Sequence, residues 1–430
     1  MTVLALMGLM LGILLFIGLP IAAVLGTTGL FWIVVQDPSL LRGAARSVMN
    51  IATGDVLVSL PLFILMGLVV QKSNVATKFY RSVALWLRGV PGGLLHANIL
   101  VCSVFGSVSG SSVATAATVG STAIPDLLKF RYDRQMLTGS LAAGGTLGIL
   151  IPPSIPMIVY GATVQESIGK LFVGAIIPAL ILIALFMSYI FIRTYRNPEL
   201  APPIQTTRPS RAEFGKSLVN TIPLVAIAAV VIGGLYFGWT TSTEAAALGL
   251  AMALLFAAAT RNINVPMLRN ALIETVYLTA MLMFIVVGAT IFSFAIFSWG
   301  INTTVANVVV GLDLPPFAVM LIISLIYVIL GMFIDPMSLM MMTISIVVPI
   351  VVNLGYDPIW FGILLVILLE VGMITPPVGM NLFTIHAISP PGTIALGDIA
   401  RGSFPYVVMI LITAVALILF PDLVLLTVRQ

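Results

Sequence analysis

The chain has 430 residues, of which 60% are hydrophobic and 8% charged, and its formal net charge is +4. A soluble globular domain is roughly 45–50% apolar and about 25% charged. The composition therefore excludes a soluble protein whose surface faces water. The charged residues are also too few to form the basic groove of a nucleic-acid-binding protein. These properties predict a membrane protein that crosses the lipid bilayer several times.

A membrane-crossing helix needs about 20 apolar residues, so the chain has room for roughly ten to a dozen crossings. The N-terminal run, 3–35, lacks the basic region and cleavage site of a signal peptide, and we expect it to stay in the membrane. Pro20 in its middle leaves open one tilted helix or two short ones. The polar stretch 193–217 divides the chain almost in half and is rich in Arg and Pro, which indicates a cytoplasmic linker.

The two halves of the chain are related at an offset of 224 residues. The offset pairs Pro125 with Pro349 and Gly148 with Gly372. It also pairs Pro91 with Pro315, Tyr132 with Tyr356, Asp133 with Asp357, Leu141 with Leu365, Pro152 with Pro376 and Pro153 with Pro377. Matches of Pro, Gly, Tyr and Asp are rarer by chance than apolar matches. The sequence therefore predicts an internal structural repeat.

Charge predicts how the two repeats sit in the membrane. Basic residues flank the segment 94–125 on both sides: Lys72, Lys78, Arg81, Arg88, Lys129, Arg131 and Arg134. The corresponding stretches of the second half, 296–315 and 350–358, contain no Lys or Arg. The positive-inside rule places the first set in the cytoplasm and the second set outside. Inverted repeats of this kind are typical of secondary transporters.

Each repeat contains a segment that is predicted to enter the membrane and turn back. In the first, 94–125, the Gly- and Ser-rich run 106–112 interrupts an apolar stretch whose two ends face the cytoplasm. Its counterpart, 316–349, breaks at Gly331 and at Asp335. Irregular backbone at this depth is tolerated where it is buried in protein or lines a polar cavity. We therefore expect two re-entrant hairpins whose tips meet near the midplane.

A broken helix is predicted after each hairpin, at 144–154 and 370–381, where two consecutive prolines interrupt an apolar run. Proline removes a backbone donor and clashes with the preceding turn, which leaves carbonyl groups free to bind a cation. The predicted fold class is thus an all-α polytopic membrane protein with inverted repeats, two re-entrant helical hairpins and two broken helices.

The first hairpin tip carries a cluster of hydroxyl groups: Ser107, Ser109, Ser111, Ser112, Thr115 and Thr118. Hydroxyl and carbonyl oxygens suit an alkali cation. The half-helix that starts near Ser111 offers free N–H groups to an anion. Close packing of helices is the alternative explanation, since it also favours small residues.

Two acidic residues lie near the second set of breaks. Asp335 either contributes to a cation site or caps the half-helix that begins at Pro336. Glu370 precedes the second proline pair and either has a function within the membrane or pairs with another subunit.

An enzyme is a weaker interpretation. The run Ser107 to Gly110 superficially resembles the serine loop of an intramembrane serine protease, and His96 and His386 are the two histidines. A nucleophilic serine needs a base within hydrogen-bond reach. His386 is expected near the cytoplasmic end of its helix, away from the membrane midplane where the serines are expected. We therefore predict no catalytic residue. The single cysteine, Cys102, excludes a Cys-based metal centre.

With these features assembled, the chain resembles the large membrane subunit (DctM/SiaM type) of a tripartite ATP-independent periplasmic (TRAP) transporter. The segments that carry the resemblance are FGSVSGSSVATAATVGSTAIP (105–125), GGTLGILIPPSIPMIVYG (144–161), GMFIDPMSLMMM (331–342) and EVGMITPPVGMNLF (370–383).

The resemblance implies a sodium-driven, elevator-type transporter in the bacterial inner membrane that imports an organic acid, such as a C4-dicarboxylate, a sialic acid or another sugar acid. It implies two partners, a separate small four-helix membrane subunit and a periplasmic solute-binding protein, and no cofactor besides the coupling sodium ions. The alternatives are a stand-alone sodium-coupled carboxylate or ion antiporter, a non-transporting membrane scaffold and, more remotely, the protease.

The resemblance also implies site residues. The first sodium site would use Ser107, Ser109, Ser112, Gly145, Gly148 and Pro152. The second would use Gly331, Asp335, Thr375, Gly379 and Met380. The substrate would lie between the tips near Ser109, Ser111, Pro153, Ser154, Pro377 and Asn381. No Arg occurs in these motifs, so the partner of the substrate carboxylate stays open.

The expected domains follow the repeats. The transport domain would comprise 91–165 and 316–388, and the scaffold 1–90 and 218–315. The segment 166–217 would add a membrane helix and the cytoplasmic linker, and 389–430 a C-terminal membrane helix.

Overall fold

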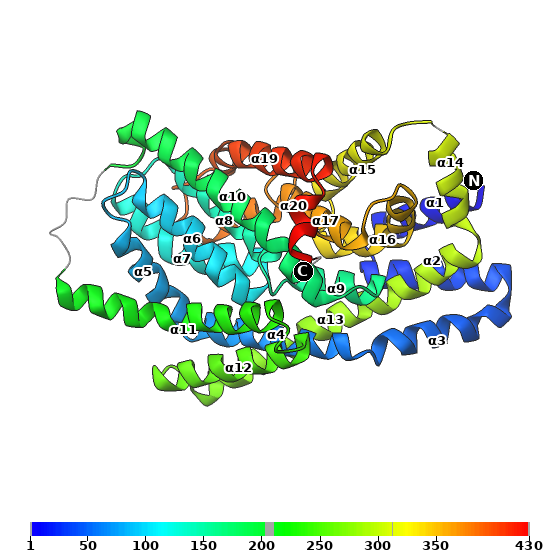
Figure 1. Ribbon diagram of the computed structural model, residues 1–430, viewed down its shortest axis with the longest axis horizontal. Coiled ribbons are helices and arrows are strands. Elements are labelled where there is room, and N and C mark those ends of the chain that lie inside the picture. The colour runs from blue at the N-terminus through cyan, green and yellow to red at the C-terminus, as the bar shows by residue number, and fades with distance from the viewer. Residues whose placement is uncertain (1, 203–209, 312, 429–430) are drawn as a thin grey trace.

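The computed structural model describes residues 2–202, 210–311 and 313–428. Within these ranges all regular structure is helical (Figure 1), which confirms the all-α part of the predicted fold class. The helices are α1 (Thr2–Phe16), α2 (Ile21–Gln36), η1 (Pro38–Leu40), α3 (Leu41–Ala52), α4 (Asp55–Lys72), α5 (Val75–Trp86), α6 (Gly93–Ser109), α7 (Ser112–Lys129), α8 (Arg134–Leu150), α9 (Ile155–Val164), α10 (Ile168–Arg196), η2 (Pro198–Leu200), α11 (Arg211–Tyr236), α12 (Ser242–Ala259), α13 (Val265–Ser298), α14 (Ile301–Gly311), α15 (Pro316–Gly331), α16 (Pro336–Asn353), α17 (Pro358–Met373), α18 (Met380–Ile388), α19 (Leu396–Leu419) and α20 (Asp422–Val428).

In the described ranges, seven helices are long and apolar enough to cross a membrane, or eight if the bent pair Pro38–Ala52 and Leu57–Lys72 forms one span. This number is below the sequence estimate because several apolar runs form shorter helices, among them α6, α15 and α17. The N-terminal run is divided into two helices, α1 and α2, which answers the question raised by Pro20. The protein is therefore a multi-pass helical membrane protein.

Long helices from the two halves of the chain pack side by side along the lower edge of Figure 1. In this long-helix layer, α2 packs on α13, α4 on α12 and α13, and α5 on α11. Glycine allows the closest approach, since a Cβ atom on Gly288 would lie 2.3 Å from the Ala22 carbonyl oxygen. The layer forms one wall of the site described below.

Two helical hairpins lie above this layer, α6–α7 and α15–α16, toward opposite ends of the molecule in Figure 1. The first turns at Gly110, whose φ of 62° is accessible to glycine. At each turn a side chain caps the second arm: Ser111 accepts a hydrogen bond from the Ala114 amide (3.4 Å) and Asp335 from the Ser338 amide (3.0 Å). Moreover, α16 begins and ends 224 residues after α7.

The two proline pairs interrupt the helices that follow the hairpins. The chain leaves the α-helix between α8 and α9 and again between α17 and α18, and in each break the Pro–Pro bond is cis. A glycine pair joins each break to its own hairpin. A Cβ on Gly106 would lie 2.5 Å from the Gly148 Cα, and one on Gly372 would lie 2.3 Å from the Gly331 carbonyl oxygen. Each hairpin tip thus rests directly on its own broken helix.

Candidate functional site

A cavity of about 510 Å³ lies where the two hairpin tips, the two broken helices and the long-helix layer meet. Its walls come from α4 and α13 on one side and from both tips on the other. The polar side chains that line it are Gln71, Ser109, Ser111, Ser112, Glu274 and Asp335. A cavity of this size accommodates a small organic molecule.

At the first tip, three oxygen atoms converge next to the first broken helix. The Ser109 and Thr115 hydroxyl groups are 2.8 Å apart, and Thr115 donates to the Ser111 carbonyl oxygen at 2.7 Å. A Cβ on Gly148 would lie 2.8 Å from the Thr115 hydroxyl oxygen and 3.1 Å from the Ser111 carbonyl oxygen. Only a residue without a side chain leaves this oxygen cluster in place, and hard oxygens of this kind suit an alkali cation.

The other residues predicted for the first sodium site take different positions. Ser107 is buried and donates to the Val104 carbonyl oxygen of its own helix at 2.7 Å. Ser112 lines the cavity and accepts a hydrogen bond from the Asn381 amide at 2.8 Å. Gly145 lies against the same amide, since a Cβ there would be 3.0 Å from the Asn381 Nδ2. Pro152 is buried in the first break.

Asn381, predicted to lie near the substrate, is fully buried behind the first tip. Besides Ser112, its amide bonds to the Ala142 carbonyl oxygen at 3.2 Å. Its Oδ1 is buried and has no hydrogen-bond partner within the described part of the chain. Asn381 therefore ties α18, in the second half of the chain, to the hairpin and broken helix of the first half.

The second tip is joined to the second break through the backbone. The Val378 amide donates to the Met332 carbonyl oxygen at 3.2 Å. Asp335 caps α16, which is one of the two roles foreseen for it, and it also lines the cavity. Thr375 donates to the Val371 carbonyl oxygen at 2.6 Å, and Met380 lines the cavity.

Gly331 and Gly379 complete the set predicted for the second sodium site. Gly331 contacts Gly372 of α17, and Gly379 has a φ of 55° at the start of α18. A Cβ on Gly379 would lie 3.1 Å from the Thr375 carbonyl oxygen. The set therefore surrounds the second break.

Of the residues predicted to approach the substrate, Ser109 and Ser111 line the cavity. Ser154 is fully buried: its hydroxyl donates to the Ile149 carbonyl oxygen and accepts from the Met157 amide, as a cap of α9. Pro153 is buried behind the first tip, where its carbonyl oxygen would be 3.0 Å from a Cβ on Gly110. Pro377 is exposed and lies outside the cavity lining.

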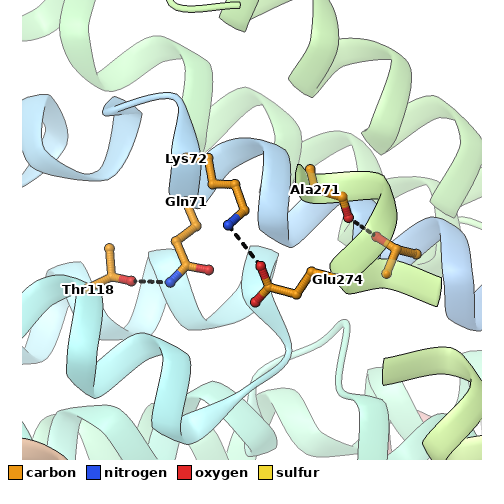
Figure 2. Close-up of polar contacts among 6 residues, drawn as sticks. Gln71, Lys72, Thr118, Ala271 and Glu274 are labelled. Carbon is orange, nitrogen blue, oxygen red and sulfur yellow. Dashed lines mark hydrogen bonds and ion pairs between the residues drawn. The ribbon is translucent and has the colours of Figure 1, made fainter. Parts of the chain in front are cut away.

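Sequence reasoning missed the contribution of the long-helix layer. Figure 2 shows Gln71 and Lys72 of α4 facing α7 and α13. The Gln71 amide donates to the Thr118 hydroxyl at 3.0 Å, and the Lys72 ammonium is 2.8 Å from a Glu274 carboxylate oxygen. Glu274 is the one acidic residue of the apolar helix α13, and this isolated charge is the feature of the sequence that could have indicated its role.

The described ranges contain no group of three His, Cys, Asp or Glu residues that could hold a metal ion. The Ser107 and Ser109 hydroxyls bond to Val104 and Thr115 rather than to a histidine. Glu370 is fully buried on α17, and neither of its carboxylate oxygens has a partner in the described part of the chain.

The model of one protein family, described as "Tripartite ATP-independent periplasmic transporter, DctM component", matches residues 7–423. The chain is 34% identical over 400 residues to the C4-dicarboxylate TRAP transporter large permease protein DctM of Pseudomonas aeruginosa, covering 92% of each. It is 29% identical over 415 residues to the sialic acid TRAP transporter large permease protein SiaM of Vibrio cholerae, covering 96% of this chain and 95% of the relative. It is 30% identical over 433 residues to the 2,3-diketo-L-gulonate TRAP transporter large permease protein YiaN of Escherichia coli, covering 100% and 99%.

Among solved structures, the fold is similar to the YdaH transporter of Alcanivorax borkumensis, with a TM-score of 0.62 and 15% identity, over 89% of this chain and 88% of that one. It is also similar to MtrF of Neisseria gonorrhoeae, with a TM-score of 0.55 and 15% identity, over 88% and 83%. At this identity the likeness concerns the fold alone.

Proposed function

Because the chain belongs to the family of DctM components of tripartite ATP-independent periplasmic transporters, and is thus a large permease subunit in the bacterial inner membrane, we propose that it imports an organic acid in symport with sodium. The observation that carries the proposal is the cavity between the two hairpin tips. It joins polar groups of both repeats to the long-helix layer at one place.

The hydroxyl and N–H groups at the hairpin tips suit a carboxylate. The Ser109 and Ser111 side chains and the first turns of α7 and α16 offer hydroxyl and N–H groups to an anion. The three relatives named above carry in their names a C4-dicarboxylate, sialic acid and 2,3-diketo-L-gulonate, which are all carboxylates. The proposed substrate class is therefore organic acids of this size.

Two sodium ions would bind where a tip meets its broken helix. The oxygen cluster of Ser109, Ser111 and Thr115 beside Gly148 supports the first site. The second would lie near Asp335 and the break around Thr375 and Gly379. Binding of the ions next to the substrate would couple the two fluxes, since each site shares a tip with the cavity.

An elevator movement would then carry the two hairpin tips and the bound substrate across the membrane. In this proposal 91–165 and 316–388 move together against 1–90 and 218–315. The glycine contacts between each tip and its broken helix, and the Asn381 bridge between the repeats, support a unit that moves as one body. A separate small membrane subunit would steady the long-helix layer, and a periplasmic solute-binding protein would deliver the substrate.

The test is uptake into proteoliposomes that hold the chain with its small subunit. Binding protein loaded with a radiolabelled acid is added under an inward sodium gradient or an equal potassium gradient. Uptake that needs both sodium and the binding protein is the expected result. Uptake without the binding protein would instead support a stand-alone carrier, and uptake that is equal in potassium would contradict sodium coupling.

A further inference from the structure

The charges around the cavity are unusual for a site that receives an anion. Among the described residues that line it, two are acidic, Glu274 and Asp335, and none is Lys, Arg or His. Asp335 accepts the Ser338 N–H at the start of α16, where the helix dipole favours a negative charge. Glu274 has a different partner, the Lys72 ammonium. The proposed sodium ion near Asp335 would offset the charge of that residue, but Glu274 would still repel an incoming carboxylate unless a cation beside α13 joined it.

Lys72 is placed to be that cation. It ends α4, directly after Gln71, which lines the cavity and bonds to Thr118 of the first hairpin. Its ammonium is 2.8 Å from an oxygen of Glu274, a lining residue, and Figure 2 shows the two side chains reaching toward each other across the gap between α4 and α13. The flexible stem of a lysine can redirect the ammonium over a short distance.

The ion pair is weak enough to exchange. The Lys72 side chain is 30% exposed and that of Glu274 is 46% exposed. Ion pairs that are open to water contribute little free energy, because the solvent screens them and two long side chains lose freedom. Replacing the Glu274 carboxylate by another carboxylate at Lys72 therefore costs little.

We propose that Lys72 is the anion-binding side chain of the cavity and that Glu274 is its counter-ion when no substrate is bound. The inference rests on the proposed transport of an organic acid. In it, a substrate carboxylate accepts from the Lys72 ammonium while the hydroxyl groups of the first tip contact the rest of the molecule. Glu274 competes with the substrate. Because Lys72 and Glu274 lie in the fixed segments 1–90 and 218–315, the substrate leaves Lys72 when the tips move, and Glu274 then pairs with Lys72 again.

The ion pair between Lys72 and Glu274 has two possible roles, a competing counter-ion or a structural brace that holds α4 against α13. The two roles predict opposite effects of Glu274→Gln on substrate binding. In a brace, Lys72→Gln and Glu274→Gln each break the same bond and both harm the protein alike. In the proposed exchange, Lys72→Gln removes the anion partner, whereas Glu274→Gln removes its competitor and also one repulsive charge. The two single variants should therefore change substrate affinity in opposite directions.

The experiment measures the dissociation constant of the acid that wild-type proteoliposomes accumulate, using the purified permease with its small subunit in lipid nanodiscs and saturating sodium. We expect Lys72→Gln to weaken binding about tenfold and Glu274→Gln to tighten it about threefold. Lys72→Arg should keep most of the affinity, since it keeps the charge. The exposed residues Lys216 and Glu199 give matched controls, and Lys216→Gln and Glu199→Gln should leave it unchanged.

Glu274→Gln is the decisive variant, because it keeps the Lys72 ammonium. It shows whether substrate affinity rises or falls even if Lys72→Gln does not fold. Weaker or unchanged binding in Glu274→Gln would overturn the inference while wild-type uptake leaves the proposed function intact. A wild-type protein that accumulates no acid with its binding protein would overturn both.

Discussion

Gly148 and Thr115 lie so close together that a Cβ atom on Gly148 would be 2.8 Å from the Thr115 hydroxyl oxygen. The contact brings the first hairpin onto its own broken helix and holds the oxygen cluster of Ser109, Ser111 and Thr115 against the start of the break. The absence of a side chain at Gly148 is thus part of the proposed sodium site, and a substitution at Gly148 tests that site directly.

Gly148→Ala should abolish sodium-dependent uptake, because the added methyl group pushes Thr115 and the Ser111 carbonyl out of position. Overpacking of this kind costs about 1–3 kcal/mol of folding stability. Uptake against sodium concentration and the melting temperature measure the two effects. Gly233→Ala is the matched control in α11: apart from the adjacent backbone of its own helix, no atom of the described chain lies within 4 Å of its Cβ position, so that variant should transport normally. Normal sodium dependence in Gly148→Ala would argue against the first site.

Sodium should stabilise the wild-type permease against heat, because an ion that binds the folded state shifts the unfolding equilibrium by about 2.7 kcal/mol at 100 times its dissociation constant. Exchanging sodium for potassium should remove this shift. Ser109→Ala should reduce it strongly, since Ser109 supplies one oxygen of the cluster. The exposed Ser121, which bonds to the Thr118 carbonyl oxygen of its own helix, provides the control Ser121→Ala. An equal sodium shift in both variants would remove Ser109 from the site.

Asn381→Ala should destabilise the protein by about 2–3 kcal/mol, because it deletes two buried hydrogen bonds and leaves a void. Thermal unfolding in detergent measures the loss. Asn50→Ala, at an exposed position of α3, should change stability by less than about 0.5 kcal/mol. If Asn381→Ala instead melts like the wild type and only raises the KM for substrate, the residue has the substrate role that the family resemblance implied.

Gly67→Ala tests whether the hairpins move against the long-helix layer. A Cβ on Gly67 would lie 2.9 Å from the Ser109 Cα and 3.2 Å from the Val108 carbonyl oxygen, so the first tip could no longer rest on α4. If the tips can also occupy a second position away from α4, the variant protein can avoid this clash. It should then melt within a few degrees of the wild type but lose transport at least tenfold, because the first position is closed to it.

The control for that experiment is Gly215→Ala in α11, because no atom of the described chain other than the adjacent backbone of its own helix lies within 4 Å of the Gly215 Cβ position. If the first tip instead stays fixed against α4, Gly67→Ala should lower the melting temperature by the full effect of overpacking. That result would speak against the elevator movement.

The local features of the chain were sufficient to predict the hairpins and the breaks. Consecutive prolines cannot continue a helix, and a run of Gly and Ser between apolar segments favours a turn, so 106–112 and the two proline pairs predicted breaks that the structure contains. The offset between the halves predicted the matching positions of α7 and α16. These predictions depend on bonds within a few residues.

The sequence could not say which way a side chain points or what distant segment it meets. Ser154 and Asn381 lie in the predicted breaks, yet the fold turns both into buried polar contacts away from the cavity, and Asn381 reaches Ser112 at a separation of 269 residues. Lys72 and Glu274 each belong to an apolar helix and become partners only because α4 packs on α13. Composition and local chain chemistry thus determined the membrane fold and its breaks. Packing between distant helices decided which groups face the cavity, because that choice depends on contacts that no local pattern encodes.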